Sequence, residues 1–241
     1  MDVIAEAAEA SARPPLTRIA WRALYRIIPT RYPPIDLFED VADADDWDVL
    51  AELEMRVNPR LRAQVGDIHL VPRERRVFGP GASVVMAPFC HVNPHGSRFS
   101  DGSYGVYYGA ARLDTAIAEV AYHAGLFFAR THEPASREDY RVLKGAIDAR
   151  LHDLRGDGWA HTRDPDDYRP PRALGRALRD AGSDGVAFMS VRHTGGQCIG
   201  AFWPNVVTLP DQNKHIAFHW DGARIATWFD YETEAWKPVP A

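Results

Sequence analysis

The sequence predicts a single α+β domain, and three observations support this prediction. The chain has 241 residues, of which 46% are hydrophobic and 25% charged, a composition typical of one globular domain. Strand and helix patterns follow one another irregularly, without the regular strand–helix repeat of a doubly wound sheet. No repeat or linker divides the chain, apart from a short arm at 1–16 that ends at two prolines. We therefore expect an N-terminal arm at 1–16 and one domain at 17–241.

The first half of the chain carries two regular patterns and one long irregular stretch. At 18–28, apolar residues alternate with arginines, which predicts a half-buried strand with Arg26 on the opposite face from the apolar side chains. At 43–55, acidic residues precede apolar ones in helical spacing, which predicts a surface helix. Residues 67–104 are rich in Gly, Pro, Ser and Asn, with a short helical candidate at 82–88. An irregular segment of this length in a compact chain is usually functional.

The second half contains the remaining predicted elements. A short aromatic strand at 105–110 precedes a helix capped by Asp114 or Thr115. The predicted buried stripe of this helix comprises Ile117, Val120, Ala121, Ala124 and Phe128. Further strands are predicted at 139–147, 184–191 and 197–204, with a helix at 170–182. Asp221-Gly222 lies between two apolar runs in 215–229, which is typical of a β-hairpin.

Composition and charge exclude several classes of protein. No apolar run approaches the roughly 18 residues that a membrane span needs, and the acidic N-terminus is unlike a signal peptide, so we expect a cytoplasmic protein without a membrane partner. The formal net charge of −5 argues against direct binding of nucleic acid. Cys90 and Cys198 lie far apart and outside any zinc-binding spacing, which indicates neither a disulfide framework nor a structural metal.

Residues 96–123 contain the most informative spacing of chemical groups. Arg98 lies in a glycine-flanked loop, Tyr108 on the predicted strand and Glu119 on the predicted helix. Arginine binds phosphate through two hydrogen bonds, an aromatic face stacks on a planar ring, and a carboxylate stabilises positive charge on a ribose carbon. A site that cleaves a dinucleotide at its glycosidic bond needs these three groups. Judged from spacing alone, structural roles are commoner than a catalytic site: a surface arginine, a core tyrosine and an exposed helical glutamate.

The same stretch resembles the core of the RES domain, a bacterial toxin family. The family pattern is similar to Gly96-Ser97-Arg98-Phe99-Ser100-Asp101-Gly102, followed by Tyr108 and by Ala116-Ile117-Ala118-Glu119. Upstream, Tyr25-Arg26-Ile27-Ile28 resembles the opening strand of the family with its first arginine, and Phe188-Met189-Ser190-Val191-Arg192 resembles the strand that carries its serine. The resemblance covers about residues 18–230. A family-specific insertion is expected at about 36–95. The longer insertion at 79–102 and the closing segment at 190–204 are similar to the ParT-type branch.

The resemblance implies a fold similar to the diphtheria-toxin class of ADP-ribosyltransferases, with a split antiparallel β-core and flanking helices, and it implies NAD+ as the substrate. Arg26 and Arg98 would then bind the pyrophosphate, and Tyr108 would stack on the nicotinamide or shape its pocket. Glu119 would bind the ribose hydroxyl and stabilise the cation-like transition state, while Ser190 would orient the ribose. The chain departs from the common family form at Phe99 and Ser100, where Trp and Asn are frequent.

Two points of the resemblance leave alternatives open. The interval between the first two arginines is longer than in compact family members, so Arg22, Arg31 or Arg76 could replace Arg26 at a phosphate. Glycine-rich nucleotide-binding motifs such as GxGxxG are absent from the sequence, so the NAD+ assignment rests on the resemblance.

Three other motifs compete weakly as sites. Cys90, His91 and His95 could be metal ligands or a Cys/His nucleophilic pair, but a loop does not fix ligand geometry as a helix does, and we expect no metal. The basic cluster at 72–76 is more typical of a solvated turn than of a contact to phosphate or an acidic partner. His193-Thr194-Gly195-Gly196 is explained by a tight turn between two strands.

The function implied is that of a toxin in a type II toxin–antitoxin pair. It would cleave the nicotinamide–ribose bond of NAD+ and transfer ADP-ribose to a protein, and the ParT-type resemblance favours a phosphoribosyl-pyrophosphate synthetase as that acceptor. NAD+ phosphorylase and NAD+ glycohydrolase activities remain as alternatives, since they share the cleavage step. An alternative of another class is a catalytically idle module that binds a nucleotide or a partner. The family also implies a small cognate antitoxin encoded nearby.

Overall fold

The computed structural model describes residues 13–30 and 66–241 of the chain. The predicted helix at 43–55, the alternative phosphate ligand Arg31 and most of the predicted arm at 1–16 lie outside these residues. Part of the predicted insertion at 36–95 lies outside them as well.

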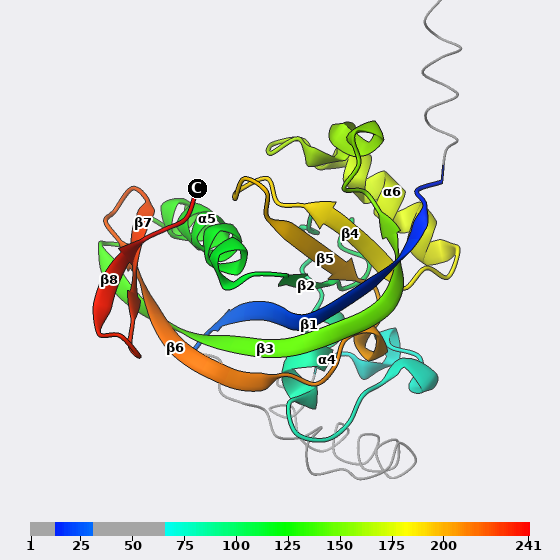
Figure 1. Ribbon diagram of the computed structural model, residues 1–241, viewed down its shortest axis with the longest axis horizontal. Helices are drawn as coiled ribbons and strands as arrows, with labels where there is room; N and C mark the ends of the chain where they lie inside the picture. Colours follow the sequence, from blue (N-terminus) through cyan, green and yellow to red (C-terminus); the bar gives the residue numbers. More distant parts are fainter. Residues whose placement is uncertain (1–12, 31–65) are drawn as a thin grey trace, which may run out of the picture.

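Within the described residues, eight strands form one curved sheet in the order β1-β2-β5-β4-β3-β6-β7-β8. The strands are β1 (Leu16–Pro29), β2 (Tyr107–Ala110), β3 (Ser136–Asp153), β4 (Gly185–Met189), β5 (Gln197–Ala201), β6 (Asp211–Trp220), β7 (Ile225–Asp230) and β8 (Ala235–Pro238). Because β1 pairs with β3 as well as with β2, the strands β1, β2, β5, β4 and β3 close into a ring. In Figure 1 the long β3 forms the lower side of this ring, and β6 runs along β3 outside the ring.

The ring has two narrow seams. β1 meets β2 only at the pair Tyr25 and Ala110, and β3 meets β4 in parallel through two residue pairs. All strand pairs between the described strands except β3 with β4 are antiparallel, including the extended ladder of β1 against β3. The predicted α+β domain is therefore confirmed. Its antiparallel core is interrupted at two places, and one of these carries a parallel pairing that the sequence did not indicate.

β1 is the strand that the alternating pattern at 18–28 predicts, but the alternation does not continue along its whole length. Trp21 pairs with Ile147 and Leu24 with Gly145, so β1 contains one residue more than β3 between these positions. Such a β-bulge reverses which side chains face each side of the sheet. Ile19 and Leu24 consequently lie in one core cluster and Ile27 in the other. The prediction of a single apolar face through Ile27 was wrong for this reason.

Helices cover both faces of the sheet. α4 (Ala82–Cys90) packs on one face, while α5 (Leu113–Thr131) and α6 (Arg169–Asp180) lie on the other (Figure 1). The predicted stripe on α5 is confirmed, since Ile117, Ala121 and Phe128 are buried and the other two residues are partly buried. α5 begins two residues earlier than predicted, however. Its first turn follows Arg112, and neither Asp114 nor Thr115 caps it.

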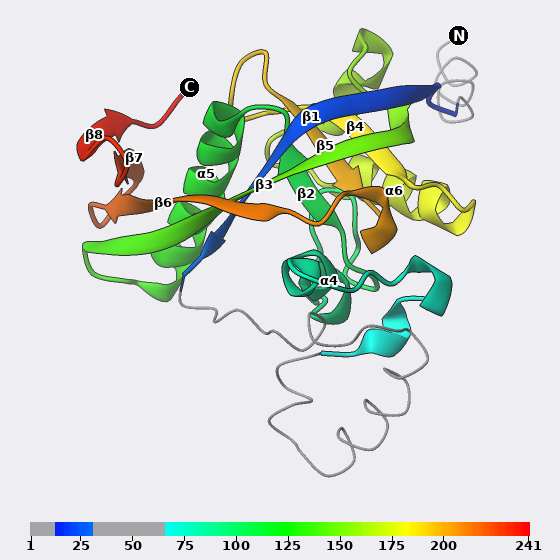
Figure 2. The same cartoon turned by 60° about the horizontal axis from the view of Figure 1, so that its bottom comes forward.

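The remaining elements are short. Short 3₁₀ helices occur at η2 (Ile68–Leu70), η3 (Arg73–Arg75), η4 (Asp157–Arg163) and η5 (Pro204–Val206). The predicted hairpin is confirmed by β6 and β7, where Gly222 adopts a φ of 96° that glycine accommodates without strain. β8 was not predicted. Figure 2 shows β7 and β8 extending the sheet beyond the end of α5.

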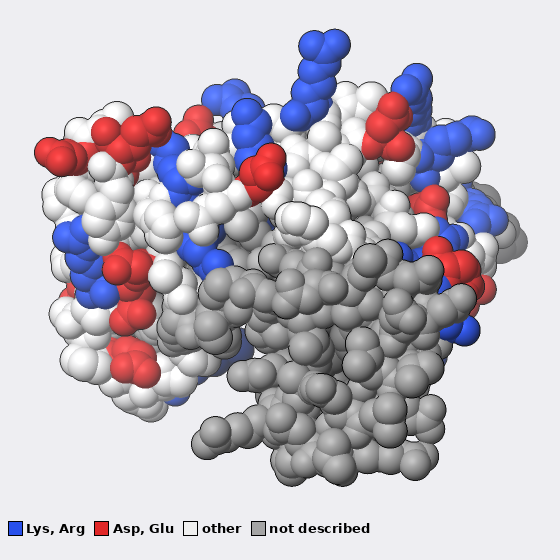
Figure 3. All heavy atoms as spheres, turned by 90° about the horizontal axis from the view of Figure 1, so that it is seen from below, with Lys and Arg blue, Asp and Glu red and all other residues white. Residues whose placement is uncertain are grey.

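The charged side chains visible in the view from below are mixed, with basic and acidic groups interspersed over the described part of that face (Figure 3). Across the described residues, none of the helices combines the length and apolar character required to traverse a lipid bilayer.

Candidate active site

A cavity of about 1480 Å³ opens between α5, the β1–β2 seam and the loops at 93–98 and 164–169. Four of the predicted site residues line it, namely Arg26, Arg98, Tyr108 and Glu119. Ser190 is not part of the wall, but its hydroxyl contacts Glu119 directly. The fold therefore brings together five side chains that span most of the described chain.

Glu119 and Ser190 form the closest contact between predicted site residues. The Ser190 hydroxyl donates to Glu119 Oε1 over 2.6 Å. The same hydroxyl accepts from the backbone amides of Arg192 and His193, at 3.1 and 3.0 Å. Because a serine hydroxyl has one proton, these two amides leave that proton for the carboxylate. The turn after β4 thus fixes the orientation of the Glu119 side chain.

Two residues near the Glu119–Ser190 contact were given no role from the sequence. His123 lies one helical turn later on α5, and its Nε2 is 3.9 Å from Glu119 Oε2. The i,i+4 spacing on a predicted helix is the signal that would have found it. The guanidinium of Arg192 stacks on the Tyr122 ring, with its carbon 3.4 Å from the ring centroid. It also donates to the Pro165 carbonyl, so it links the turn after β4 to the loop at 164–169.

Arg98 is buried, with 8% of its surface exposed, and only part of its guanidinium is paired. Nη1 donates to the carbonyls of Thr162 and Asp164, at 3.1 and 2.9 Å. The guanidinium lies over the ring of Tyr168, 4.4 Å from its centroid. Nη2 is buried and has no hydrogen-bond partner among the described residues. A buried cationic donor without an acceptor is costly unless a ligand satisfies it, and an anionic oxygen is the acceptor it suits best.

Tyr108 holds the loop that carries Arg98. Its hydroxyl accepts from the Phe99 amide over 2.9 Å and shares a hydrogen bond of 2.8 Å with the Ser97 hydroxyl. Its ring packs edge-on against Phe188. Burial raises the pKa of Tyr108 to about 12, outweighing the hydrogen bonds from Ser97 and Phe99, so it stays a neutral phenol. The sequence predicts a stacking role, and the structure adds this positioning contact.

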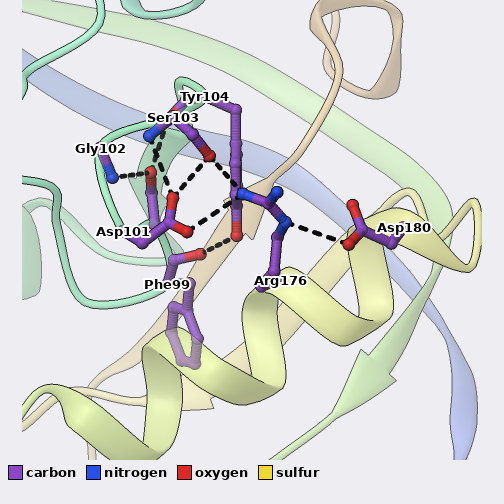
Figure 4. A network of polar contacts seen from close by, with 8 residues as sticks. Phe99, Asp101, Gly102, Ser103, Tyr104, Arg176 and Asp180 are labelled. Carbon is purple, nitrogen blue, oxygen red and sulfur yellow. Dashed lines mark hydrogen bonds and ion pairs between the residues drawn. The ribbon is translucent and has the colours of Figure 1, made fainter.

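Internal hydrogen bonds hold the rest of the loop, as Figure 4 shows. The Tyr104 hydroxyl donates to the Phe99 carbonyl, and Ser100 bridges Tyr104 and Gly102. Arg176 of α6 forms an ion pair with Asp101 and a hydrogen bond with Ser103. Gly96 and Gly102 have φ angles of 74° and 99°, where a Cβ would collide with backbone atoms. Phe99 and Ser100, the two departures from the common family form, are both buried parts of this loop.

Arg26 lies at the seam between β1 and β2. Its Nη1 donates to the Tyr108 carbonyl over 3.0 Å, and its guanidinium stacks 4.6 Å from the centroid of the Tyr107 ring. Burial lowers its pKa, and the Nε proton has no partner among the described residues. Of the alternatives, Arg22 and Arg76 do not line the cavity, and Arg76 Nε donates to the Val71 carbonyl.

Most of the weaker motifs occupy structural positions, although His95 lines the large cavity. Cys90 is buried in the α4 core, and burial raises its pKa to about 12, which disfavours a reactive thiolate. Arg75 of the basic cluster pairs with Asp184. His193, in the turn between β4 and β5, shares a hydrogen bond with Thr115. In the parts of the chain that the structure describes, no three His, Cys, Asp or Glu side chains cluster as metal ligands would.

Comparisons with known proteins concern both sequence and fold. The family model of the RES domain matches residues 73–221, a range that includes Arg98, Tyr108, Glu119 and Ser190 but not Arg26. Protein y4oC of Sinorhizobium fredii is 30% identical over 212 residues, which cover 86% of this chain and 87% of that protein. The crystal structure of the M. tuberculosis MbcT–MbcA toxin–antitoxin complex matches with a TM-score of 0.45 and 14% identity, over 90% of this chain and 92% of that one.

Proposed function

The chain belongs to the RES domain family, and on that basis we propose that it is an NAD+-consuming toxin that cleaves the nicotinamide–ribose bond. The observation that carries this proposal is the Glu119 carboxylate, oriented by Ser190 in the same cavity as the unpaired Nη2 of Arg98. Together they offer a stabiliser of positive charge and a binding group for phosphate. At about 1480 Å³ the cavity exceeds the roughly 300–1,000 Å³ of ordinary ligand pockets, which gives the volume that a dinucleotide needs.

In the proposed reaction the bond between nicotinamide and C1 of its ribose breaks, and its electron pair leaves with neutral nicotinamide. The ribose carbon becomes cation-like, and the negative charge of Glu119 stabilises that state. Arg98 binds the pyrophosphate through Nη2, with Arg26 at the neighbouring seam as the second arginine. Tyr108 shapes the nicotinamide pocket and holds the Arg98 loop, while Ser190 orients Glu119.

The acceptor completes the reaction by forming a new bond to the ribose carbon. We propose a protein side chain, for which the ParT-type resemblance suggests a phosphoribosyl-pyrophosphate synthetase. Phosphate or water in the same place would make the protein an NAD+ phosphorylase or glycohydrolase. A cognate antitoxin that covers the cavity is the proposed partner, on the strength of the family resemblance.

The test is to incubate the purified chain with NAD+, with and without phosphate and with and without cell lysate. Nicotinamide release and the fate of ADP-ribose are followed, with E119Q as the inactive control and E133Q as a matched substitution at an exposed glutamate. Release that depends on Glu119 supports the enzyme, and the product identifies the acceptor as protein, phosphate or water. No release by antitoxin-free protein under any condition would favour an idle binding module.

A further inference from the structure

A second, smaller cavity of about 290 Å³ lies on the other side of the loop that carries Arg98. It shares no lining residue with the large cavity. Its polar wall includes Arg179 of α6, and its apolar wall includes Leu70, Val71 and Phe89. Ser103, Tyr104 and Gly105 also line it, and the first two belong to the loop shown in Figure 4.

The guanidinium of Arg179 lies between two aromatic rings of this cavity. Its carbon is 4.5 Å from the Tyr104 ring centroid and 4.3 Å from that of Trp203. Both rings are held in place, because the Tyr104 hydroxyl donates to Phe99 and the Trp203 indole donates to Ser183. The position of Arg179 is thus defined by stacking, which leaves the edge of the guanidinium for hydrogen bonds.

That edge has no protein partner among the described residues, unlike the guanidinium groups of the neighbouring arginines. Arg176 pairs with Asp101 and Asp180, and Arg75 pairs with Asp184. The side chain of Arg179 makes no hydrogen bond or ion pair with a described residue, and its Nε is buried without a partner. Burial lowers the pKa of Arg179, and nearby Tyr104, Asp180 and Asp101 only partly offset this effect. An acceptor placed at this edge would offset the cost of burying the charge.

We propose that this cavity is a binding site for a small molecule that carries a carboxylate or phosphate group. Two oxygens of the anion would accept from the edge of Arg179, in the bidentate geometry that arginine favours. The apolar part of the molecule would lie against Leu70, Val71 and Phe89. At 290 Å³ the cavity is at the lower limit for small-molecule sites, so it selects a compact ligand.

The site is coupled to the large cavity by its position, and this second step rests on the proposed function. Tyr104 stacks on Arg179, and its hydroxyl donates over 2.6 Å to the carbonyl of Phe99, the residue after Arg98. An anion that fixes Arg179 and Tyr104 therefore also constrains the backbone that presents Arg98. We infer that the occupied site changes the KM for NAD+.

Binding is tested without reference to activity. The unfolding temperature is measured against increasing benzoate or inorganic phosphate at constant ionic strength, which yields an apparent Kd and distinguishes carboxylate from phosphate. In R179Q we expect this Kd to weaken at least about tenfold, the effect of losing a charge-assisted pair. Leu70 is exposed, so L70E should fold normally, and its added carboxylate should weaken anion binding as well. The matched control R150Q removes an exposed arginine elsewhere and should bind as the wild type does.

Each other outcome has a defined meaning. If R98Q loses the effect and R179Q keeps it, the anion binds in the large cavity and the proposed site is wrong. If all variants respond alike, the stabilisation is not site-specific and the proposal also fails. Where binding is confirmed and NAD+ is turned over, an unchanged KM at saturating anion would overturn the coupling alone. If NAD+ is not turned over, the result counts against the proposed function, and the inferred effect of the anion on the KM for NAD+ is rejected as well.

Discussion

At Glu119, the two carboxylate oxygens have different surroundings. Oε1 is fixed by the Ser190 hydroxyl, while Oε2 faces His123. The E119Q substitution keeps the shape and removes the charge that the proposed transition state needs. We expect kcat for nicotinamide release to fall about 10²–10³-fold, the usual cost of one electrostatic group, with little change in NAD+ affinity. Single-turnover kinetics and equilibrium binding separate the two effects, and a loss confined to affinity would contradict this role.

Arg98 should affect binding more than turnover. In R98A the unpaired donor is removed, so the proposed pyrophosphate contact is lost, at a cost of about 1.5–3 kcal/mol. Isothermal titration with NAD+ measures this, using R169Q as the control because Arg169 pairs with Asp167 at the exposed rim. Equal weakening in both variants would indicate general loss of positive charge instead of a specific contact.

The hydroxyl of Tyr108 should contribute to stability. Y108F leaves the Phe99 amide without its acceptor and the Ser97 hydroxyl without its partner. Since an unsatisfied buried group costs about 1–3 kcal/mol, we expect the free energy of unfolding to fall by that amount. Urea denaturation checks this, with Y25F as a comparison on β1. If Y108F had the same free energy of unfolding as the wild type, the other hydrogen bonds of the loop would be sufficient to hold it.

At the scale of elements, α6 packs against the loop so closely that a glycine is required. A Cβ on Gly175 would lie 2.3 Å from the Phe99 carbonyl. Alanine normally stabilises a helix by about 1 kcal/mol relative to glycine, but here we expect G175A to destabilise the protein by about 1–3 kcal/mol through overcrowding. The exposed Ala177 gives the contrast, since A177G should cost about 1 kcal/mol from helix propensity alone. Thermal unfolding of the three proteins decides whether crowding outweighs propensity.

Elements that depend on local patterns were predictable, and those that depend on distant partners were not. The α5 stripe and the Asp221-Gly222 hairpin follow from local spacing. The bulge after Trp21 does not, because it arises from the register of β1 against β3. β8 escaped detection because its alternating burial covers only four residues.

The predicted site residues illustrate the same distinction. Family resemblance named the five residues, but it did not indicate how each is held. The contact of Ser190 with Glu119 crosses 71 residues. The role of Tyr108 in holding the loop depends on the fold of residues 97–99. Arg179 could not be predicted as a binding residue, because arginines on helices are usually solvated.

For the whole molecule, acid should weaken the sheet where β6, β7 and β8 meet. Burial alone would raise the pKa of Asp230, but hydrogen bonds from Lys237, the Glu232 amide and Lys214 lower it to about 2. Because this is below the unfolded value of about 3.9, Asp230 stabilises the fold above pH 4. This contribution disappears as the pH falls towards 2. Urea unfolding between pH 5 and 2 should show that the free energy of unfolding falls more steeply for the wild type than for D230N. Parallel curves would mean that other groups cause the acid sensitivity.

The closed ring of strands also determines when the protein becomes complete during its synthesis. The hydrogen bond between Pro14 and His152 joins positions 138 residues apart. At translation speeds of about 5–20 residues per second, the first strand waits on the order of ten seconds for its partner. Glu119 then waits for Ser190 to emerge. Until β3 has left the ribosome, β1 exposes an unpaired edge that favours aggregation or capture by a chaperone. The candidate site is completed later still, when the turn after β4 has emerged.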